Sequence, residues 1–237
     1  MEYKGIKLQP RLSCIASCVA QGARLADVGT DHGYLPIYLL QQGRIVHAIA
    51  SDLREEPLAH ARRSAAEYGI GEEMELRLCS GLDAIRPDEA DTVVIAGMGG
   101  ELIIKILEAA PWTRERPLKL ILQPQTKIEL LRMWLVENGY RFTGEHLVRD
   151  KGTLYTVLCV TAGKCAPLTP AQALCGILLQ HDPLYGEHLD EHILKLTRAV
   201  QGMRSAKSCD PNEIADLTAL IEALKISREE WQNDNRA

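Results

Sequence analysis

The chain has 237 residues, 46% of them hydrophobic and 25% charged, and this balance excludes a disordered or low-complexity protein. No apolar run reaches the roughly 18–20 residues of a membrane span, and the start MEYKGIKLQPRL lacks the apolar core of a secretory signal, so we expect a cytoplasmic protein without a membrane partner. The net charge of −5 argues mildly against nucleic acid as a ligand.

Short apolar, β-branched runs alternate with helical patterns up to about residue 162, which predicts an α/β fold with a mostly parallel sheet covered on both faces. The expected strands are residues 24–28, 46–51, 75–79, 92–96 and 118–123, and the expected helices lie near residues 34–42, 56–68, 100–109 and 126–138. Residues 140–148 and 154–160 follow without a helix between them, and the connector RDKG favours a turn, so we expect an antiparallel hairpin at one sheet edge. Five parallel strands plus an edge hairpin are typical of a Rossmann-like methyltransferase sheet, whereas a dinucleotide-binding domain more often has a sixth parallel strand.

The stretch TAGKCAPLTP, residues 161–170, is the only segment with the composition of a domain boundary. It divides the chain into a catalytic domain at residues 1–163 and a small all-helical domain at residues 164–237. Apolar residues recur at helical spacing in the second domain, and Pro183 and Pro211 divide it into three helices. The last two are expected to form a coiled-coil-like antiparallel hairpin, packed on itself or on the first domain.

The segment LADVGTDHGYLP is the most informative, because a strand runs into a D-x-G-x-D-x-G turn and then into a helix. Gly29 and Gly33 let the backbone approach a ligand, and the following helix offers its positive end. Asp31 would repel a pyrophosphate but suits a ligand that carries an ammonium and a sulfonium. His32 is a candidate contact to cofactor or substrate. A tight turn without any ligand is the alternative interpretation of these residues.

Carboxylates follow the second and third expected strands. Asp52, next to Leu53, can accept hydrogen bonds from both hydroxyls of a ribose, as in other nucleoside-binding α/β domains. Asp83, two residues after Gly81, would lie beside an adenine and accept from its exocyclic amine. A helix cap and ordinary loop chemistry explain Asp52 and Asp83 separately, but in combination with the glycine turn they indicate a nucleoside site.

The fourth and fifth expected strands lead into AGMGGE and QPQT. Gly97 and Gly99 open a cleft at the strand end, and Met98 offers an apolar wall for a flat base. The amides of Gln123 and Gln125 can read a base edge by paired hydrogen bonds. All these segments lie at the carboxyl ends of strands, where open α/β sheets bind ligands.

The seven cysteines, at positions 14, 18, 79, 159, 165, 175 and 209, are scattered and form no paired CxxC knuckles. Cys14 and Cys18 share a helix face, but buried small hydrophobic residues explain this spacing better than a zinc site does. We therefore expect no disulfide and no metal. The sequence also has no Ser-His-Asp set, HExxH or P-loop to support hydrolysis or phosphate transfer.

Charge is unevenly distributed along the chain, so the sequence is compatible with a basic face on the first domain despite the negative net charge. Residues 1–26 hold four basic and one acidic side chain, and residues 100–164 hold ten basic and seven acidic ones. Residues 165–237 hold seven basic and eleven acidic ones. The candidates for phosphate contact, each equally explained as an ordinary surface charge, are Lys4, Lys7, Arg11, Arg114, Arg116, Lys119, Arg149 and Lys151.

Five segments carry a resemblance to a known family: DVGTDHGYLP, the SD that ends the second strand, AGMGGELI, LQPQT and the basic start ending in LQPRL. Together they resemble the bacterial tRNA (adenine(22)-N(1))-methyltransferase family, over nearly the whole chain. The resemblance implies that tRNA is gripped by both domains. It also implies that S-adenosylmethionine is bound by Asp27, Gly29, Thr30, His32, Gly33, Asp52 and Asp83. The amino-methyltransferase signature Asn/Asp-Pro-Pro-Tyr/Phe is replaced here by AGMGG, which leaves the catalytic residues open.

Nitrogen 1 of neutral adenine has an in-plane lone pair, so methyl transfer to it needs alignment more than it needs a base. Asp31 and Asp83 are the candidate catalytic residues, because a carboxylate near the amine would stabilise the cation formed on the purine. The target base has to leave its RNA helix before it can react. The candidate substrate contacts are Arg11, Gly99, Gln123 and Gln125.

Three other functions fit the same sequence. A methyltransferase acting on a small molecule or a protein would keep the cofactor site and change the acceptor. A nicotinamide-dependent oxidoreductase is disfavoured because the turn lacks G-x-G-x-x-G. The third is a cofactor-binding regulatory or scaffold protein whose helical domain binds a partner. We expect a monomer or a weak homodimer.

Overall fold

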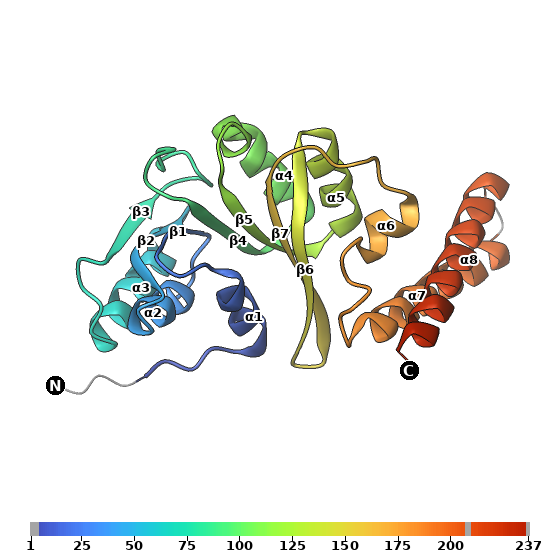
Figure 1. Ribbon diagram of the computed structural model, residues 1–237, viewed down its shortest axis with the longest axis horizontal. Coiled ribbons are helices and arrows are strands. Elements are labelled where there is room, and N and C mark those ends of the chain that lie inside the picture. The colour runs from blue at the N-terminus through green and yellow to red at the C-terminus, as the bar shows by residue number, and fades with distance from the viewer. Residues whose placement is uncertain (1–4, 207–209, 236–237) are drawn as a thin grey trace. The chain divides into compact units, whose positions relative to one another are not determined.

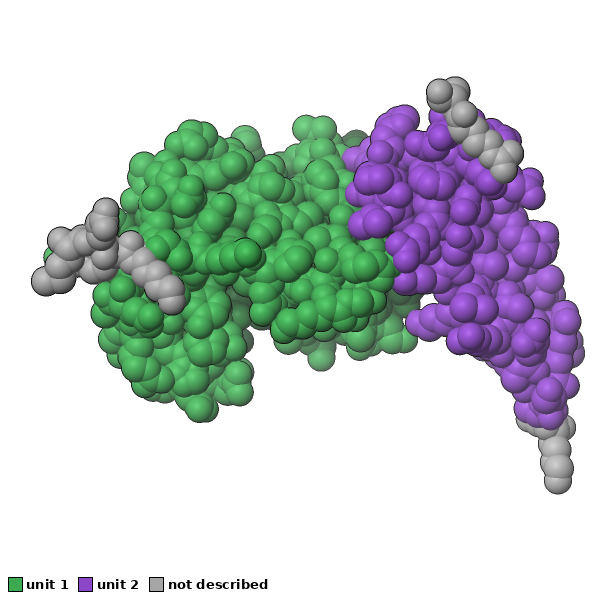
Figure 2. Space-filling view, turned by 90° about the horizontal axis from the view of Figure 1, so that it is seen from below, with its two compact units in different colours: residues 1–167 green, residues 168–237 purple. Residues whose placement is uncertain are grey.

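The computed structural model describes residues 5–206 and 210–235. It divides into two compact units, residues 1–167 and 168–237, which Figure 2 colours separately. The boundary expected from the sequence, between residues 163 and 164, lies in the same connector. Lys4 and Cys209, which the sequence analysis named, lie outside the described residues.

A seven-stranded sheet with the order β3-β2-β1-β4-β5-β7-β6 forms the centre of the first unit (Figure 1). Its strands are β1 (Ala23–Val28), β2 (Ile45–Asp52), β3 (Met74–Leu78), β4 (Thr92–Gly99), β5 (Lys119–Thr126), β6 (Tyr140–Asp150) and β7 (Thr153–Ala162). The first five strands are parallel, and β7 runs antiparallel to both β5 and β6. The expected parallel core with an antiparallel edge hairpin is confirmed.

The turn of the edge hairpin shows why the connector RDKG was informative. Its two central residues, Lys151 and Gly152, both have positive φ angles, 49° and 84°. Such angles occur in the two-residue turns whose twist matches that of the flanking strands, and glycine adopts them at little cost. The long β6 and β7 that this turn joins carry several of the side chains described below.

Helices cover both faces of the sheet (Figure 1). One face carries α1 (Pro10–Cys18), α2 (Tyr34–Gln41) and α3 (Glu55–Glu67), and the other carries α4 (Gly100–Ala109), the 3₁₀ turn η1 (Pro111–Arg114) and α5 (Ile128–Glu137). Helix α1 packs on β6 and β7, while α2 and α3 pack on β1, β2 and β3. Residues of α1, α2 and the strands beneath them, such as Ile15, Ile37 and Val157, are fully buried in a shared core. The apolar face of α1 therefore fixes the N-terminal segment to the sheet edge.

Strands β4 and β5 continue beyond the ends expected at Ala96 and Gln123, as far as Gly99 and Thr126. The pairing shifts register around Met98, next to Gly97, whose φ of 78° is left-handed. Gly100 then lies so close to the Lys127 carbonyl that a Cβ atom would collide with it. The glycines thus allow an irregular continuation of the strand pair, which a pattern of alternating apolar residues does not predict.

The second unit contains three helices in its described part, as the sequence predicts: α6 (Pro170–Cys175), α7 (Tyr185–Ser205) and α8 (Pro211–Asp234). Thr169 and Gln172 form a capping box at the start of α6. Asp190 near the start of α7 pairs with Arg228 near the end of α8 over 3.0 Å, so the two long helices are antiparallel. Among the described residues, no helix has the length and apolar character to cross a membrane.

Candidate functional site

A cavity of about 350 Å³ opens at the carboxyl end of β1. Its wall is made by the segment that enters α1, by the turn between β1 and α2, and by the start of α2. The predicted residues that line it are Arg11, Asp27, Gly29, Thr30, Asp31, His32 and Gly33. The cavity volume is in the range of small-molecule sites.

The turn from β1 into α2 is anchored to the end of the neighbouring strand. The N–H groups of Gly29 and Thr30 both donate to the carbonyl of Ser51, over 2.8 and 2.9 Å. Gly29 and Gly33 have φ angles of 77° and 68°, which side chains adopt only with strain. The Met98 methyl group packs directly over Gly29, where a Cβ atom would meet it. Glycine at position 29 therefore leaves the room that the Met98 side chain occupies.

Asp27 brings a buried carboxyl group to this cavity. The residue is only 8% exposed, and burial raises its pKa to about 6, against a smaller lowering by the Thr30 hydroxyl. Within the described part of the chain no basic side chain forms an ion pair with it. A ligand that carries a cationic group would favour the ionised carboxylate.

Aromatic and imidazole rings form a stack at the cavity wall. The His32 ring lies between those of Tyr34 and His60, with centroid distances of 5.0 and 4.8 Å. Asp31 contacts His32 over 3.6 Å, and its own side chain is 74% exposed. A flat ligand group at this wall would therefore meet the stacked rings around His32 and the exposed carboxylate of Asp31.

Other predicted cofactor residues do not line this cavity. The Asp52 carboxylate, mostly buried at the end of β2, accepts from the N–H of Arg54 over 2.8 Å. Leu53 beside it is 70% exposed. Gly81 and Asp83 lie in the turn after β3, with Asp83 exposed. Asp52 directly follows Ser51, whose carbonyl anchors the glycine turn of the cavity wall.

Gln123 is committed to protein contacts. It is fully buried, its Oε1 accepts from Nη1 of Arg11 over 2.8 Å and from the N–H of Gly97 over 3.2 Å, and its Nε2 donates to the Pro124 carbonyl. Gln125 is exposed, and its Nε2 lies near Gly97. Of the two glutamines, Gln125 has its amide open to a substrate, whereas Gln123 positions its neighbours.

Arg11 connects the cavity to the edge hairpin. Its guanidinium lies over the Tyr155 ring, 5.7 Å from the centroid, and its backbone N–H, in the first turn of α1, donates to the Asp150 carboxylate over 3.4 Å. The Asp150 carboxylate thus accepts from an N–H group that has no acceptor within the helix, because it lies in the first turn. No sequence pattern indicates Asp150 or Tyr155 as neighbours of Arg11, since only the fold brings β6 and β7 next to α1.

The segment before α1 was also underestimated. Lys7, Leu8 and Gln9 precede α1 and line the cavity together with Leu12 of the helix, although the sequence indicated only the basic character of this stretch. Lys119, another basic candidate, donates from Nζ to the Cys18 carbonyl over 2.5 Å and so has a structural contact. The described basic residues nearest the cavity are therefore Lys7 and Arg11.

Comparison with known proteins gives a consistent family. Residues 8–158 match the family model described as "Methyltransferase domain". The tRNA (adenine(22)-N(1))-methyltransferase of Bacillus subtilis is 37% identical over 158 residues, which are 67% of this chain and 66% of that protein, so the match spans just under two thirds of this relative. A putative tRNA methyltransferase of Mycoplasma pneumoniae is 34% identical over 71% of this chain and 79% of its own length.

Solved structures extend the similarity to both units. A putative tRNA (m1A22) methyltransferase of Streptococcus pneumoniae, in complex with S-adenosyl-L-methionine, has 34% identity and a TM-score of 0.81, covering 92% of this chain and 98% of its own. The B. subtilis m1A22 tRNA methyltransferase has 29% identity and a TM-score of 0.84, covering 94% of this chain and 99% of its own.

Proposed function

We propose that this chain, which belongs to the bacterial tRNA (adenine(22)-N(1))-methyltransferase family, transfers a methyl group from S-adenosylmethionine to ring nitrogen 1 of adenine 22 in tRNA. The observation that carries the proposal is the cavity in which the glycine turn and the buried Asp27 carboxyl group meet Arg11. The Arg11 guanidinium, which would contact the RNA substrate, and the Asp27 carboxyl group, which would bind a cationic ligand group, thus line the same cavity. A nicotinamide-dependent oxidoreductase has no support in the family match.

The cofactor, when bound, supplies a methyl group activated by its sulfonium. Asp27 would bind its ammonium, the backbone of residues 29–33 would contact the amino acid part, and Asp52 would accept from the ribose hydroxyls. Leu53, Gly81 and Asp83 would complete the site around the adenine. Met98, which packs over Gly29, would close the wall between cofactor and acceptor.

On the acceptor side, the chain mainly has to position the base. Arg11 is held by Gln123 and Tyr155, so its remaining donors point from a fixed place toward substrate. Gln125 and the backbone at Gly97 and Gly99 would receive the flipped adenine. Alignment of donor and acceptor in a dry site supplies most of the acceleration, because nitrogen 1 already carries a lone pair. Between the two candidate catalytic carboxylates, Asp31 is favoured because it lines the cavity and Asp83 does not.

The remaining features of the assignment follow from this reaction. Residues 1–163 would bind the cofactor, and the coiled-coil-like helical domain at residues 164–237 would assist in gripping tRNA through shape, since its charge is net acidic. A tRNA substrate places the protein in the cytoplasm. A monomer or a weak homodimer is sufficient, because every proposed contact to the cofactor comes from one chain.

Methylation of a tRNA transcript tests the proposal. The purified protein is incubated with S-adenosylmethionine and an unmodified transcript that carries adenine at position 22, and the nucleosides are measured by mass spectrometry. The expected product is 1-methyladenosine, which disappears when position 22 is changed to guanosine. Equal methylation of both transcripts would refute the position, and methylation of neither would favour an enzyme with a small-molecule or protein acceptor.

A further inference from the structure

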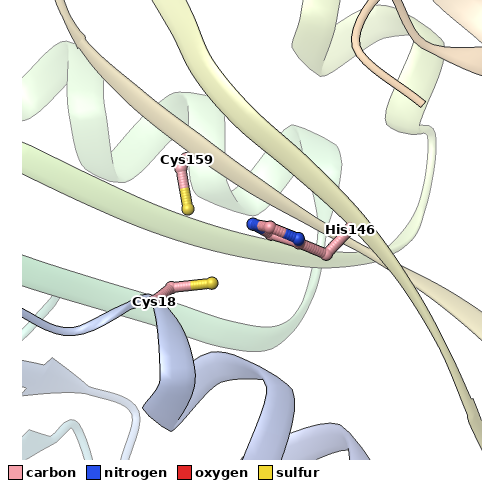
Figure 3. Close-up of side chains that lie close together, drawn as sticks. All are labelled: Cys18, His146 and Cys159. Atoms are coloured by element: carbon pink, nitrogen blue, oxygen red, sulfur yellow. The ribbon is translucent and has the colours of Figure 1, made fainter. Parts of the chain in front are cut away.

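Two buried cysteines and a histidine meet between α1 and the edge hairpin (Figure 3). The Sγ atoms of Cys18 and Cys159 and a ring nitrogen of His146 all lie within 4.8 Å of one another. Cys18 is the last residue of α1, whereas the cavity is lined by residues that enter the same helix. The cluster is therefore separate from the proposed methyl-transfer site.

The edge hairpin brings His146 and Cys159 onto the same face. Cys159 in β7 pairs with Gly144 in β6, and His146 pairs with Val157, so the two side chains are diagonal neighbours. The absence of a side chain at Gly144 leaves room for the imidazole. A Cβ atom at that position would lie 3.4 Å from Nε2 of His146 and 3.7 Å from Cβ of Cys159. The ring can consequently lean across the strand pair toward the sulfur.

The third side chain is held by the end of α1. The Cys18 thiol donates to the Cys14 carbonyl over 3.3 Å, and the Cys18 carbonyl accepts from Nζ of Lys119 in β5. Cys18 and Cys159 are 7% and 3% exposed, whereas His146 is exposed and covers them from the solvent side. Figure 3 shows the three functional groups directed toward a common space.

The two thiols differ in how readily they ionise. Hydrogen bonding to Cys14 and Cys159, together with the nearby His146, lowers the pKa of Cys18 despite its burial. The interaction with Cys18, and burial, raise the pKa of Cys159. A cation placed between the two sulfur atoms would favour ionisation of both.

We propose that Cys18, Cys159 and His146 form a structural binding site for a Zn²⁺-like cation. Two thiolates and an imidazole are the ligands that zinc prefers in proteins, and a water molecule or the Cys14 thiol would be the fourth. Ligands bound to one zinc ion lie about 3.5–3.8 Å apart, from bond lengths of about 2.0–2.3 Å in tetrahedral geometry. The observed limit of 4.8 Å therefore requires only a small inward movement of flexible side chains.

The proposed site goes beyond the sequence analysis, in which only the Cys14–Cys18 spacing suggested a metal. The three proposed ligands come from α1, β6 and β7. Cys18 lies more than 100 residues before His146 and Cys159 in the sequence. A bound cation would fasten the end of α1 to the sheet edge. Since the same helix carries Arg11, metal binding would stabilise the wall of the cavity without entering the reaction.

The test uses the full-length, reduced, metal-free protein and Co²⁺ as a spectroscopic probe for Zn²⁺. A second group, Cys175, His188 and His192, lies within residues 168–237, so all measurements are made in a His192→Ala background. We expect one equivalent of Co²⁺ to give thiolate-to-cobalt charge-transfer bands and tetrahedral d–d bands, which Zn²⁺ abolishes by displacement. Thermal unfolding should move to higher temperature when Zn²⁺ is added.

Three variants and one control locate the ion. Cys18→Ser, Cys159→Ser and His146→Ala are each expected to weaken Zn²⁺ binding at least about tenfold, since each removes one of few ligands. Cys165→Ser, a cysteine in the connector, should bind as the parent does. His146 is exposed, so its replacement keeps the test valid if a cysteine variant fails to fold. Absence of the cobalt bands in the His192→Ala parent, an unchanged Zn²⁺ affinity in the His146 variant, or a Cys18–Cys159 disulfide in place of metal would overturn the proposal.

Discussion

Nη1 of Arg11 donates a 2.8 Å hydrogen bond to Oε1 of Gln123, which joins α1 to β5 across 112 residues of sequence. The same oxygen accepts from the N–H of Gly97 at the irregular end of β4. One buried amide therefore fixes the position of the arginine relative to the glycine segment.

Replacement of Arg11 by lysine is expected to impair tRNA methylation while leaving cofactor binding nearly unchanged. Lysine keeps the charge but loses the guanidinium contacts to Gln123 and Tyr155. A loss of about 2 kcal/mol, typical of a hydrogen bond to a charged group, lowers kcat/KM for tRNA about 30-fold. Steady-state kinetics and calorimetry measure the two effects, with Arg86→Lys, at an exposed position, as the control. An unchanged kcat/KM would contradict the role of Arg11.

Affinity for S-adenosylmethionine is expected to depend on pH through Asp27. Its pKa of about 6 lies above the ordinary 3.8, so the folded protein takes up this proton more readily than the unfolded chain. Its contribution to stability therefore falls as the pH rises from 3.8 to about 6. A cationic ligand needs the ionised form, so affinity should rise up to about pH 6 and then level off. Asp27→Asn should bind weakly and without this dependence. A pH-independent affinity in the parent protein would contradict the prediction.

The buried ion pair between Arg132 of α5 and Glu145 of β6 is expected to control stability. Both side chains are fully buried, and their charged groups lie 2.8 Å apart. Glu145→Gln should lower the free energy of unfolding by about 3–5 kcal/mol, because it removes the carboxylate charge that lies against a buried guanidinium. Urea denaturation followed by circular dichroism measures this change. Arg132→Met combined with Glu145→Leu should recover most of the loss, and a double variant as unstable as the single one would refute the explanation.

Gly100→Ala is expected to destabilise the protein by about 1–3 kcal/mol, since the added methyl group collides with the Lys127 carbonyl. Gly202→Ala in α7 is the matched control. It has open space around it and lies inside a helix, so it should stabilise by about 0.5–1 kcal/mol. Thermal unfolding compares the two variants. Equal stability would show that the close approach of the start of α4 to the Lys127 carbonyl does not require glycine.

Periodicity predicted the fold because its elements are locally encoded. The parallel strands alternate with amphipathic helices, and the turn at Lys151 and Gly152 marks the edge hairpin. Strand ends were less accurate. β4 and β5 continue through glycine and proline residues that normally end a strand, and this continuation depends on pairing between Gly99 and Thr126, which local sequence does not contain.

The site was predictable where one short segment supplies it. Residues 27–33 form a cavity wall because their glycines fix the turn locally. The Arg11 contacts with Gln123, Tyr155 and Asp150 join segments that are distant in sequence, so no spacing rule could find them. The same holds for Cys18, His146 and Cys159, whose proximity depends on packing of α1 against the hairpin.

Calorimetric titration of the purified protein with S-adenosylmethionine measures occupancy of the cavity itself. We expect saturable binding at one molecule per chain in the parent protein, and a strong loss of affinity in Asp27→Ala, because the Asp27 carboxyl group lies in the wall of the cavity. A parent protein that binds neither this compound nor S-adenosylhomocysteine would contradict the assignment of the cavity and, with it, the proposed reaction.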